Sequence, residues 1–133
     1  MHDYSKIITI EDPLKSVTVG SKKYYLTANI FYGGVHYTVR TKIINTVSLW
    51  LRSYLKKGMM PELEEMDISI AFWIKNNNWD IDNKPFFWSK VILDMLKKDC
   101  VPEDCVKYVP RASYSYEGKG NKMEITITGK LKL

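Results

Sequence analysis

Residues 67–74 have the sequence Asp-Ile-Ser-Ile-Ala-Phe-Trp-Ile, and this stretch decides the fold class. Every second residue from Ile68 to Ile74 is large and apolar, and this alternation predicts a strand with one strongly apolar face. The strand is expected to end at Lys75, because the three asparagines that follow are typical of a turn.

A helix is expected before this strand in the chain. Apolar residues recur at spacings of three and four from Ile44 to Leu55, with polar residues on the opposite side. Thr41 is placed to cap the start of the helix, and Gly58 is placed to end it.

A second helix is predicted after the strand, from about Pro85 to Lys98. Proline is tolerated in a first turn because its missing N–H has no helical partner there. The residues expected to form the buried stripe of this helix are Phe87, Val91, Ile92, Met95 and Leu96.

The remaining strands are predicted from β-branched and aromatic runs next to glycines. They are a strand at 5–10, a hairpin of 23–31 and 35–40 around Gly33-Gly34, and a closing hairpin of 106–116 and 122–131 around 118–121. This order predicts an α+β fold with a mixed β-sheet and two main α-helices, in a single domain over residues 1–133.

The composition bounds the class of protein. A chain of 133 residues with 13% aromatics can form one folded core and is not a disordered tail. The net charge of +5 is compatible with a nucleic-acid partner without requiring one. No run approaches the ~20 apolar residues of a membrane span, and the N-terminus lacks the pattern of a signal peptide. A soluble, reduced, cytoplasmic protein is expected, although a bridge between Cys100 and Cys105 stays open.

The segment Asp80-Ile81-Asp82-Asn83 lies between the central strand and the second helix. If it is extended, its two aspartates point to one side with Cα atoms about 6–7 Å apart. Carboxylates so placed repel each other unless a cation lies between them, and Mg²⁺ prefers oxygen ligands. The alternative is an N-cap beside a solvated aspartate. A calcium loop is excluded, because Pro85 and Val91 stand where it needs glycine and glutamate.

These residues resemble the RusA family of Holliday junction resolvases. The resemblance rests on Asp80-x-Asp82-Asn83, a lysine in the following helix, Asp94-x-Leu96 and the acidic pair Glu103-Asp104 ahead of a strand. It is specific over residues 79–106 and weak over residues 1–40. Lys90 lies four residues before Asp94, as in the family, but more residues than usual separate it from Asn83.

The resemblance implies a homodimer that binds four-way DNA junctions and nicks two opposed strands with Mg²⁺, or with Mn²⁺. The metal ligands and catalytic carboxylates would be Asp80, Asp82 and Asp104, with Glu103 as an alternative to Asp104. Lys90 would be the active-site lysine, with Lys84 as the alternative. The expected contacts to the DNA backbone are Lys75, Lys84, Lys97, Lys98, Lys107 and Arg111.

Two other functions compete with this hypothesis. One is a protein of the same fold that binds DNA junctions without cutting them. The other is a protein-interaction module in which the carboxylates are caps and the positive charge is incidental. Because phages and prophages often carry resolvases of this family, the resemblance implies a bacterial or phage origin.

Overall fold

The fold is known from a computed structural model that describes residues 3–55, 60–75, 83–97, 100–102 and 107–133. Its elements, in chain order, are β1 (Tyr4–Glu11), β2 (Ser16–Val19), β3 (Lys22–Tyr25), α1 (Asn29–Tyr32), α2 (Tyr37–Leu51), β4 (Leu63–Trp73), α3 (Asn83–Leu96), β5 (Arg111–Gly118) and β6 (Lys122–Leu131). The predicted α+β class with a mixed sheet is confirmed.

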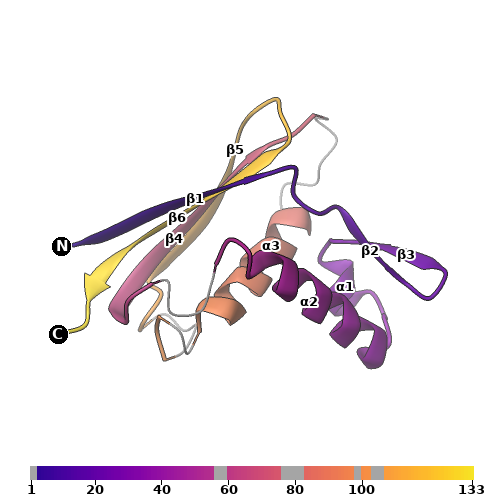
Figure 1. Ribbon diagram of the computed structural model, residues 1–133, viewed down its shortest axis with the longest axis horizontal. Helices are drawn as coiled ribbons and strands as arrows, with labels where there is room; N and C mark the ends of the chain where they lie inside the picture. Colours follow the sequence, from indigo (N-terminus) through magenta and orange to yellow (C-terminus); the bar gives the residue numbers. More distant parts are fainter. Residues whose placement is uncertain (1–2, 56–59, 76–82, 98–99, 103–106) are drawn as a thin grey trace.

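The main sheet has four strands in the order β1-β6-β4-β5. The strand β6 pairs antiparallel with both β1 and β4, whereas β4 and β5 run parallel and are connected in sequence through α3. Parallel neighbours need a crossover connection of this kind, because a tight turn reverses the chain. The chain termini lie at one end of this sheet, and the small β2–β3 sheet lies toward the other (Figure 1).

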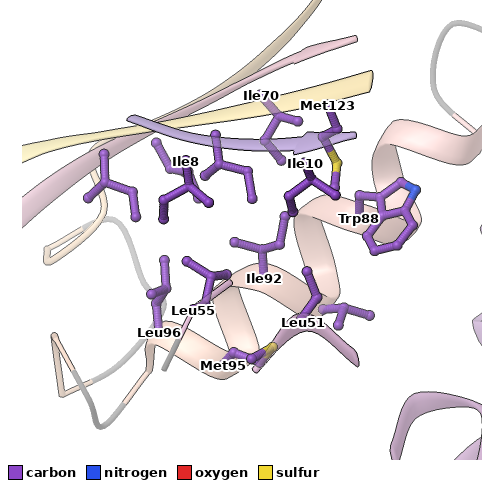
Figure 2. Close-up of a cluster of buried hydrophobic side chains, with 14 of the residues drawn as sticks. Ile8, Ile10, Leu51, Leu55, Ile70, Trp88, Ile92, Met95, Leu96 and Met123 are labelled. Carbon is purple, nitrogen blue, oxygen red and sulfur yellow. The ribbon is translucent and has the colours of Figure 1, made fainter. Parts of the chain in front are cut away.

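One face of the main sheet carries the core. In the register, Ile70 lies beside Ile125 and Phe72 lies beside Met123, and all four side chains are almost completely buried. Helices α2 and α3 lie against this face (Figure 1). Figure 2 shows Leu51 and Ile92 among the helical side chains that meet Ile8, Ile10, Ile70 and Met123 of the sheet. Burial of this apolar area is the main source of the stability of the fold.

The residues that alternate with the core residues along each strand point to the opposite face of the sheet, which is more polar. Ser69, Thr126 and Ser113 lie on this face, and Ile7 is a large apolar residue there with 60% of its surface exposed. A sheet covered on one side only is expected to alternate in this way.

The second predicted helix is confirmed as α3, with the whole predicted stripe buried. The first is confirmed as α2, but both its start and its end were placed too late, since the helix ends at Leu51 with Arg52 as its C-cap. Helix α2 begins at Tyr37, and His36 is its N-cap, with Nδ1 accepting from the Thr38 N–H at 3.3 Å. Thr41 instead donates its hydroxyl to the Tyr37 carbonyl at 2.8 Å.

The predicted hairpin around Gly33-Gly34 is wrong. The helix α1 occupies part of 23–31, and residues 37–40 belong to α2. The β-branched Thr38 and Val39 favoured a strand locally. Val39, however, packs against the core one turn before the fully buried Ile43, so tertiary packing decides for helix.

The structure instead contains a hairpin earlier in the chain. The strands β2 and β3 pair antiparallel around Gly20 and Ser21, and Gly20 has a φ of 65°. This backbone conformation lies in the left-handed region, which glycine adopts easily because it has no Cβ to clash with the backbone.

The predicted closing hairpin is also wrong in its pairing. Both strands exist, but β5 and β6 lie on opposite sides of β4. The connection crosses the end of β4, where the Ile74 N–H donates to the Gly118 carbonyl at 3.0 Å and the Gly120 N–H donates to the Ile74 carbonyl at 3.2 Å. A Cβ on Gly120 would lie 3.0 Å from the Cβ of Trp73, so this close crossing depends on glycine.

Candidate functional site

A cavity of about 320 Å³ lies where the carboxyl end of β4 meets the beginning of α3. Five separate parts of the described chain line it: the segment after β1, the residue after β3, the end of β4, the first turns of α3 and the start of β6. The lining residues are Pro13, Leu14, Lys15, Leu26, Phe72, Trp73, Ile74, Lys75, Lys84, Trp88, Asn121 and Lys122. Its volume is at the lower end of the range for small-molecule sites.

The lining is strongly basic. Among the described residues it contains four lysines, Lys15, Lys75, Lys84 and Lys122, and no aspartate or glutamate. Like charges around one concave surface raise the local positive potential, because the low-dielectric walls focus the field. The cavity is therefore suited to an anion such as a phosphate group.

Lys84 has the most perturbed environment of these lysines. It lies in the first turns of α3 and is partly buried. Burial lowers the pKa of Lys84, and the positive charge of Lys15 lowers it further. Both causes disfavour the charged form of the Lys84 ammonium group. An anion bound beside the two lysines would favour that charged form and so raise the pKa again.

Three of the described lining residues, Phe72, Trp73 and Trp88, are aromatic. Trp88 is only 3% exposed and belongs to the core, as does Phe87 on the same helix. The ammonium group of Lys122 lies 4.2 Å from the centre of the Trp73 ring, within the range of a cation–π contact. Trp73 therefore holds Lys122 at the edge of the cavity.

A smaller aromatic cluster lies on α1 and α3. The ring of Phe86 lies 5.6 Å from that of the exposed Tyr32 and 6.1 Å from that of Phe31. Of the aromatic residues in segment 79–88, Phe86 is only partly buried, whereas Trp79 lies outside the described residues. Phe87, which the sequence placed in the buried stripe of this helix, is buried, and so is Trp88.

The two lysines considered as the active-site lysine differ in their position relative to the cavity. Lys84 lines the cavity, whereas Lys90 does not. Lys90 points its ammonium group toward Asp94 at 3.5 Å, in an exposed pair one helical turn apart. Exposed pairs of this kind contribute little to stability, at most about 0.5 kcal/mol.

The other predicted DNA contacts fall into three groups. Lys75 lines the cavity beside Lys84. Lys97, Lys107 and Arg111 do not, and Lys107 instead lies over the Tyr108 ring at 5.2 Å. Lys98 lies outside the described residues.

Sequence reasoning missed Lys15 and Lys122. They are far apart in the chain, and neither belongs to a recognisable motif. They meet because β1 and β6 are neighbours, and the segment after β1 starts beside the beginning of β6. There the Asp12 N–H donates to the Asn121 carbonyl at 2.9 Å, and the Asn121 side chain donates to the Asp12 carboxylate.

The three predicted metal ligands, Asp80, Asp82 and Asp104, lie outside the described residues, as does Glu103. Within the described ranges, no group of three His, Cys, Asp or Glu side chains is arranged to hold a metal ion. The lysines of the cavity do not fit a cation. A fit to Mg²⁺ therefore rests on the oxygen donors of those carboxylates, which are the ligands that Mg²⁺ prefers.

No protein-family model and no curated protein matches this chain. The likeness to the RusA family consequently rests on the motif residues themselves. Among the described helices, none is both long and apolar enough to cross a membrane.

Proposed function

We propose that this protein is a metal-dependent endonuclease that nicks branched DNA, as its resemblance to the RusA resolvases implies. The observation that carries the proposal is the lysine-lined cavity. Lys75, the last described residue before the Asp80-x-Asp82 motif, and Lys84, two residues after Asp82, both line it. A cavity lined by lysines thus lies at the end of β4 and the start of α3, the two elements between which the motif stands in the sequence.

The lysines have a direct role in this proposal. Lys15, Lys84 and Lys122 bind phosphate groups of the DNA backbone in the cavity. Without them the acidic motif would repel the DNA, since each phosphate carries a negative charge. Lys84 is the active-site lysine in the proposal, because Lys90 lies outside the cavity lining and faces Asp94. Partly buried charges in such a site act strongly on a developing negative charge.

The carboxylates have a separate role. Asp80, Asp82 and Asp104, or Glu103 in place of the last, would hold Mg²⁺ or Mn²⁺. A bound divalent metal lowers the pKa of water and stabilises charge on the phosphate. The protein would act as a homodimer, because two symmetric nicks need two active sites.

One alternative has a specific observation in its favour. A protein that binds branched DNA without cutting it needs the lysines alone, and the charged residues that line the cavity are all lysines in the part of the chain that the structure describes. Such a protein would bind DNA in the absence of metal, lose affinity steeply with salt, and show no nicks.

The deciding experiment is a nicking assay on a synthetic four-way junction and on the matching linear duplex, with and without Mg²⁺. We expect paired, metal-dependent nicks on the junction, which disappear in Asp82→Asn while binding remains. Lys84→Ala is expected to reduce cleavage strongly. Lys130→Ala is the matched control, because Lys130 faces Glu64 at 3.3 Å and does not line the cavity. Junction binding without nicks in the wild type would favour the alternative, and neither binding nor nicks would refute both.

A further inference from the structure

The cavity at the carboxyl end of β4 has an apolar floor and a basic rim. Its floor consists of Leu26, Phe72 and Trp88, which have at most 3% of their surface exposed. The four lysines of the described lining are all more exposed, and Lys15 and Lys75 lie fully at the surface. A buried residue that lines a cavity forms its inner wall, whereas an exposed one lies at its opening. The cavity therefore changes from apolar to cationic between its inner wall and its opening.

The volume of this cavity is larger than a phosphate group alone requires. About 320 Å³ is at the lower end of the range for sites that bury a small organic ligand. Such sites are mostly apolar, with a few polar groups that fix the orientation of the ligand. A phosphate bound at the rim would leave the apolar floor in contact with water. A ligand that fits both parts has an anionic group joined to an apolar or aromatic group of moderate size.

The aromatic residues and one amide of the lining favour a nucleobase as that second group. Phe72, Trp73 and Trp88 provide ring surfaces, on which bases stack because every base has a π-face. Asn121 also lines the cavity, and its side-chain nitrogen donates to the Asp12 carboxylate. This bond fixes the orientation of the amide, whose oxygen is an acceptor for an N–H group on the edge of a base.

Backbone hydrogen bonds hold the walls of the cavity in place. The Asp12 N–H donates to the Asn121 carbonyl at 2.9 Å, and the Leu26 N–H donates to the Lys15 carbonyl at 3.0 Å. These two bonds connect the segment after β1 to the start of β6 and to the end of the β2–β3 hairpin. A ligand that enters a preformed cavity does not have to order the segments that surround it, which favours tight binding.

The position of the floor restricts which nucleotides can reach it. In duplex DNA the bases are paired and stacked, and enzymes that bind one base in a pocket act on single strands or turn the base out of the stack. A paired nucleotide can place its phosphate at the rim, but its base cannot reach Phe72 and Trp88. An unpaired nucleotide can occupy both parts of the cavity.

We propose that this cavity binds one unpaired nucleotide, with its phosphate at the lysines of the rim and its base against the apolar floor. Two sources supply this chemistry: an unpaired position in a DNA strand and a free nucleoside monophosphate. For the DNA source the inference rests on the proposed function, and it adds that unpaired nucleotides at the branch are preferred to a fully paired branch. Nucleotide binding itself requires neither metal nor cleavage.

The test compares ligands with and without bases by fluorescence anisotropy in the absence of metal. The probe is a short labelled oligothymidylate, and the comparison ligand is the same sugar–phosphate chain with abasic sites in place of the bases. The wild type is expected to bind the oligothymidylate about tenfold more tightly, as stacking of a single base allows. Equal affinities for the two ligands would overturn the proposal.

Two variants separate the floor of the cavity from its rim. Leu14→Trp places a large side chain at a partly buried position of the lining and is expected to abolish the preference for bases. Lys122→Ala is expected to weaken both ligands by a similar factor and to keep the preference. Val19→Trp is the matched control, because Val19 is also partly buried against the core but is not among the described lining residues. An unchanged preference in Leu14→Trp would overturn the proposal.

Competition identifies the source of the nucleotide. Displacement of the oligothymidylate by micromolar thymidine monophosphate would support the proposal with a free nucleotide as the ligand. Displacement by unlabelled strands alone would support it with DNA as the ligand, and a junction with unpaired nucleotides at its centre is then expected to bind more tightly than a fully paired junction. Nicking without a preference for bases would overturn this inference alone. A preference for bases without nicking would support this inference and contradict only the proposed cleavage.

Discussion

Lys15 and Lys84 line the same cavity, and the charge of Lys15 is the second of two causes, after burial, that lower the pKa of Lys84. Lys15 lies in the segment before β2, whereas Lys84 lies in the first turns of α3. Two like charges brought together from distant parts of a chain disfavour each other's charged form. An anion bound at the two lysines would offset this effect.

The first prediction concerns the pH dependence of anion binding. Because the pKa of Lys84 is lowered, its ammonium group loses its proton at a lower pH than that of an ordinary lysine. Affinity for metal-free junction DNA is thus expected to fall as pH rises through this lowered pKa. Lys15→Met removes the like charge and should raise the pKa of Lys84. NMR titration of labelled lysines would measure both effects, with a short unstructured lysine peptide as the reference. Titration of Lys84 together with that peptide would contradict the prediction.

The second prediction concerns the salt dependence of DNA binding. Each lysine that neutralises a phosphate releases counterions, so removing one reduces the slope of log K against log salt by about 1. Lys84→Ala and Lys122→Ala are each expected to have this effect in fluorescence anisotropy titrations without metal. Lys130→Ala should leave the slope unchanged, since Lys130 does not line the cavity. An equal loss of slope in all three variants would point to non-specific binding over the whole surface.

The third prediction concerns the core between the sheet and α3. Ile92 and Ile125 are completely buried, one on each side of the helix–sheet interface. Truncation of either to alanine removes apolar contacts and leaves a cavity, which is expected to lower the free energy of unfolding by about 2–5 kcal/mol. Ile7→Ala, at a position that is 60% exposed, should change it by no more than about 0.5 kcal/mol. Urea denaturation measures all three variants, and equal effects would mean that the two faces of the sheet are wrongly assigned.

The fourth prediction concerns Gly129, where β6 passes close to β4. A Cβ at this position would lie 2.6 Å from the carbonyl oxygen of Glu65, which is part of the backbone of β4 and cannot easily move. Gly129→Ala is therefore expected to destabilise the protein by about 1–3 kcal/mol through overpacking.

The matched control for Gly129→Ala is Gly20→Ala. No heavy atom lies within 4 Å of a Cβ built at Gly20, so only its φ of 65° opposes the substitution. The cost of that change is expected to be about 1 kcal/mol. If Gly129→Ala were the milder of the two in thermal or urea unfolding, the close approach of β6 to β4 would be refuted.

Local patterns in the sequence were enough to find most of the regular elements. The alternation at 67–74 located the core of β4, and the apolar spacing after Pro85 located α3. Alternation and helical spacing are consequences of which face is buried, and for these two elements the burial is one-sided. The same patterns failed at residues 35–40, where β-branched residues suggested a strand and packing of Val39 and Ile43 produced a helix.

The pairing of strands could not be read from the sequence. The run from Arg111 to Leu131 looks like a hairpin, yet β4 lies between its two strands. Turn-forming residues between two strands indicate that the chain reverses direction there. They do not indicate whether a third strand lies between the two strands that they connect. That outcome depends on β4, whose two sides can both form ladders, and on Gly120, which permits the close crossing over Trp73.

For the candidate site, the sequence by itself determined the acidic motif Asp80-x-Asp82-Asn83, the lysine that follows it, and the α+β class that presents them. These are local features, fixed by residue type and spacing along one segment. Only the tertiary structure decided that Lys84 rather than Lys90 lines the cavity, and that Lys15 and Lys122 join it. The physical reason is that a concave, charged surface is made by segments distant in the chain, which meet only when the sheet order and the helix crossover bring them together.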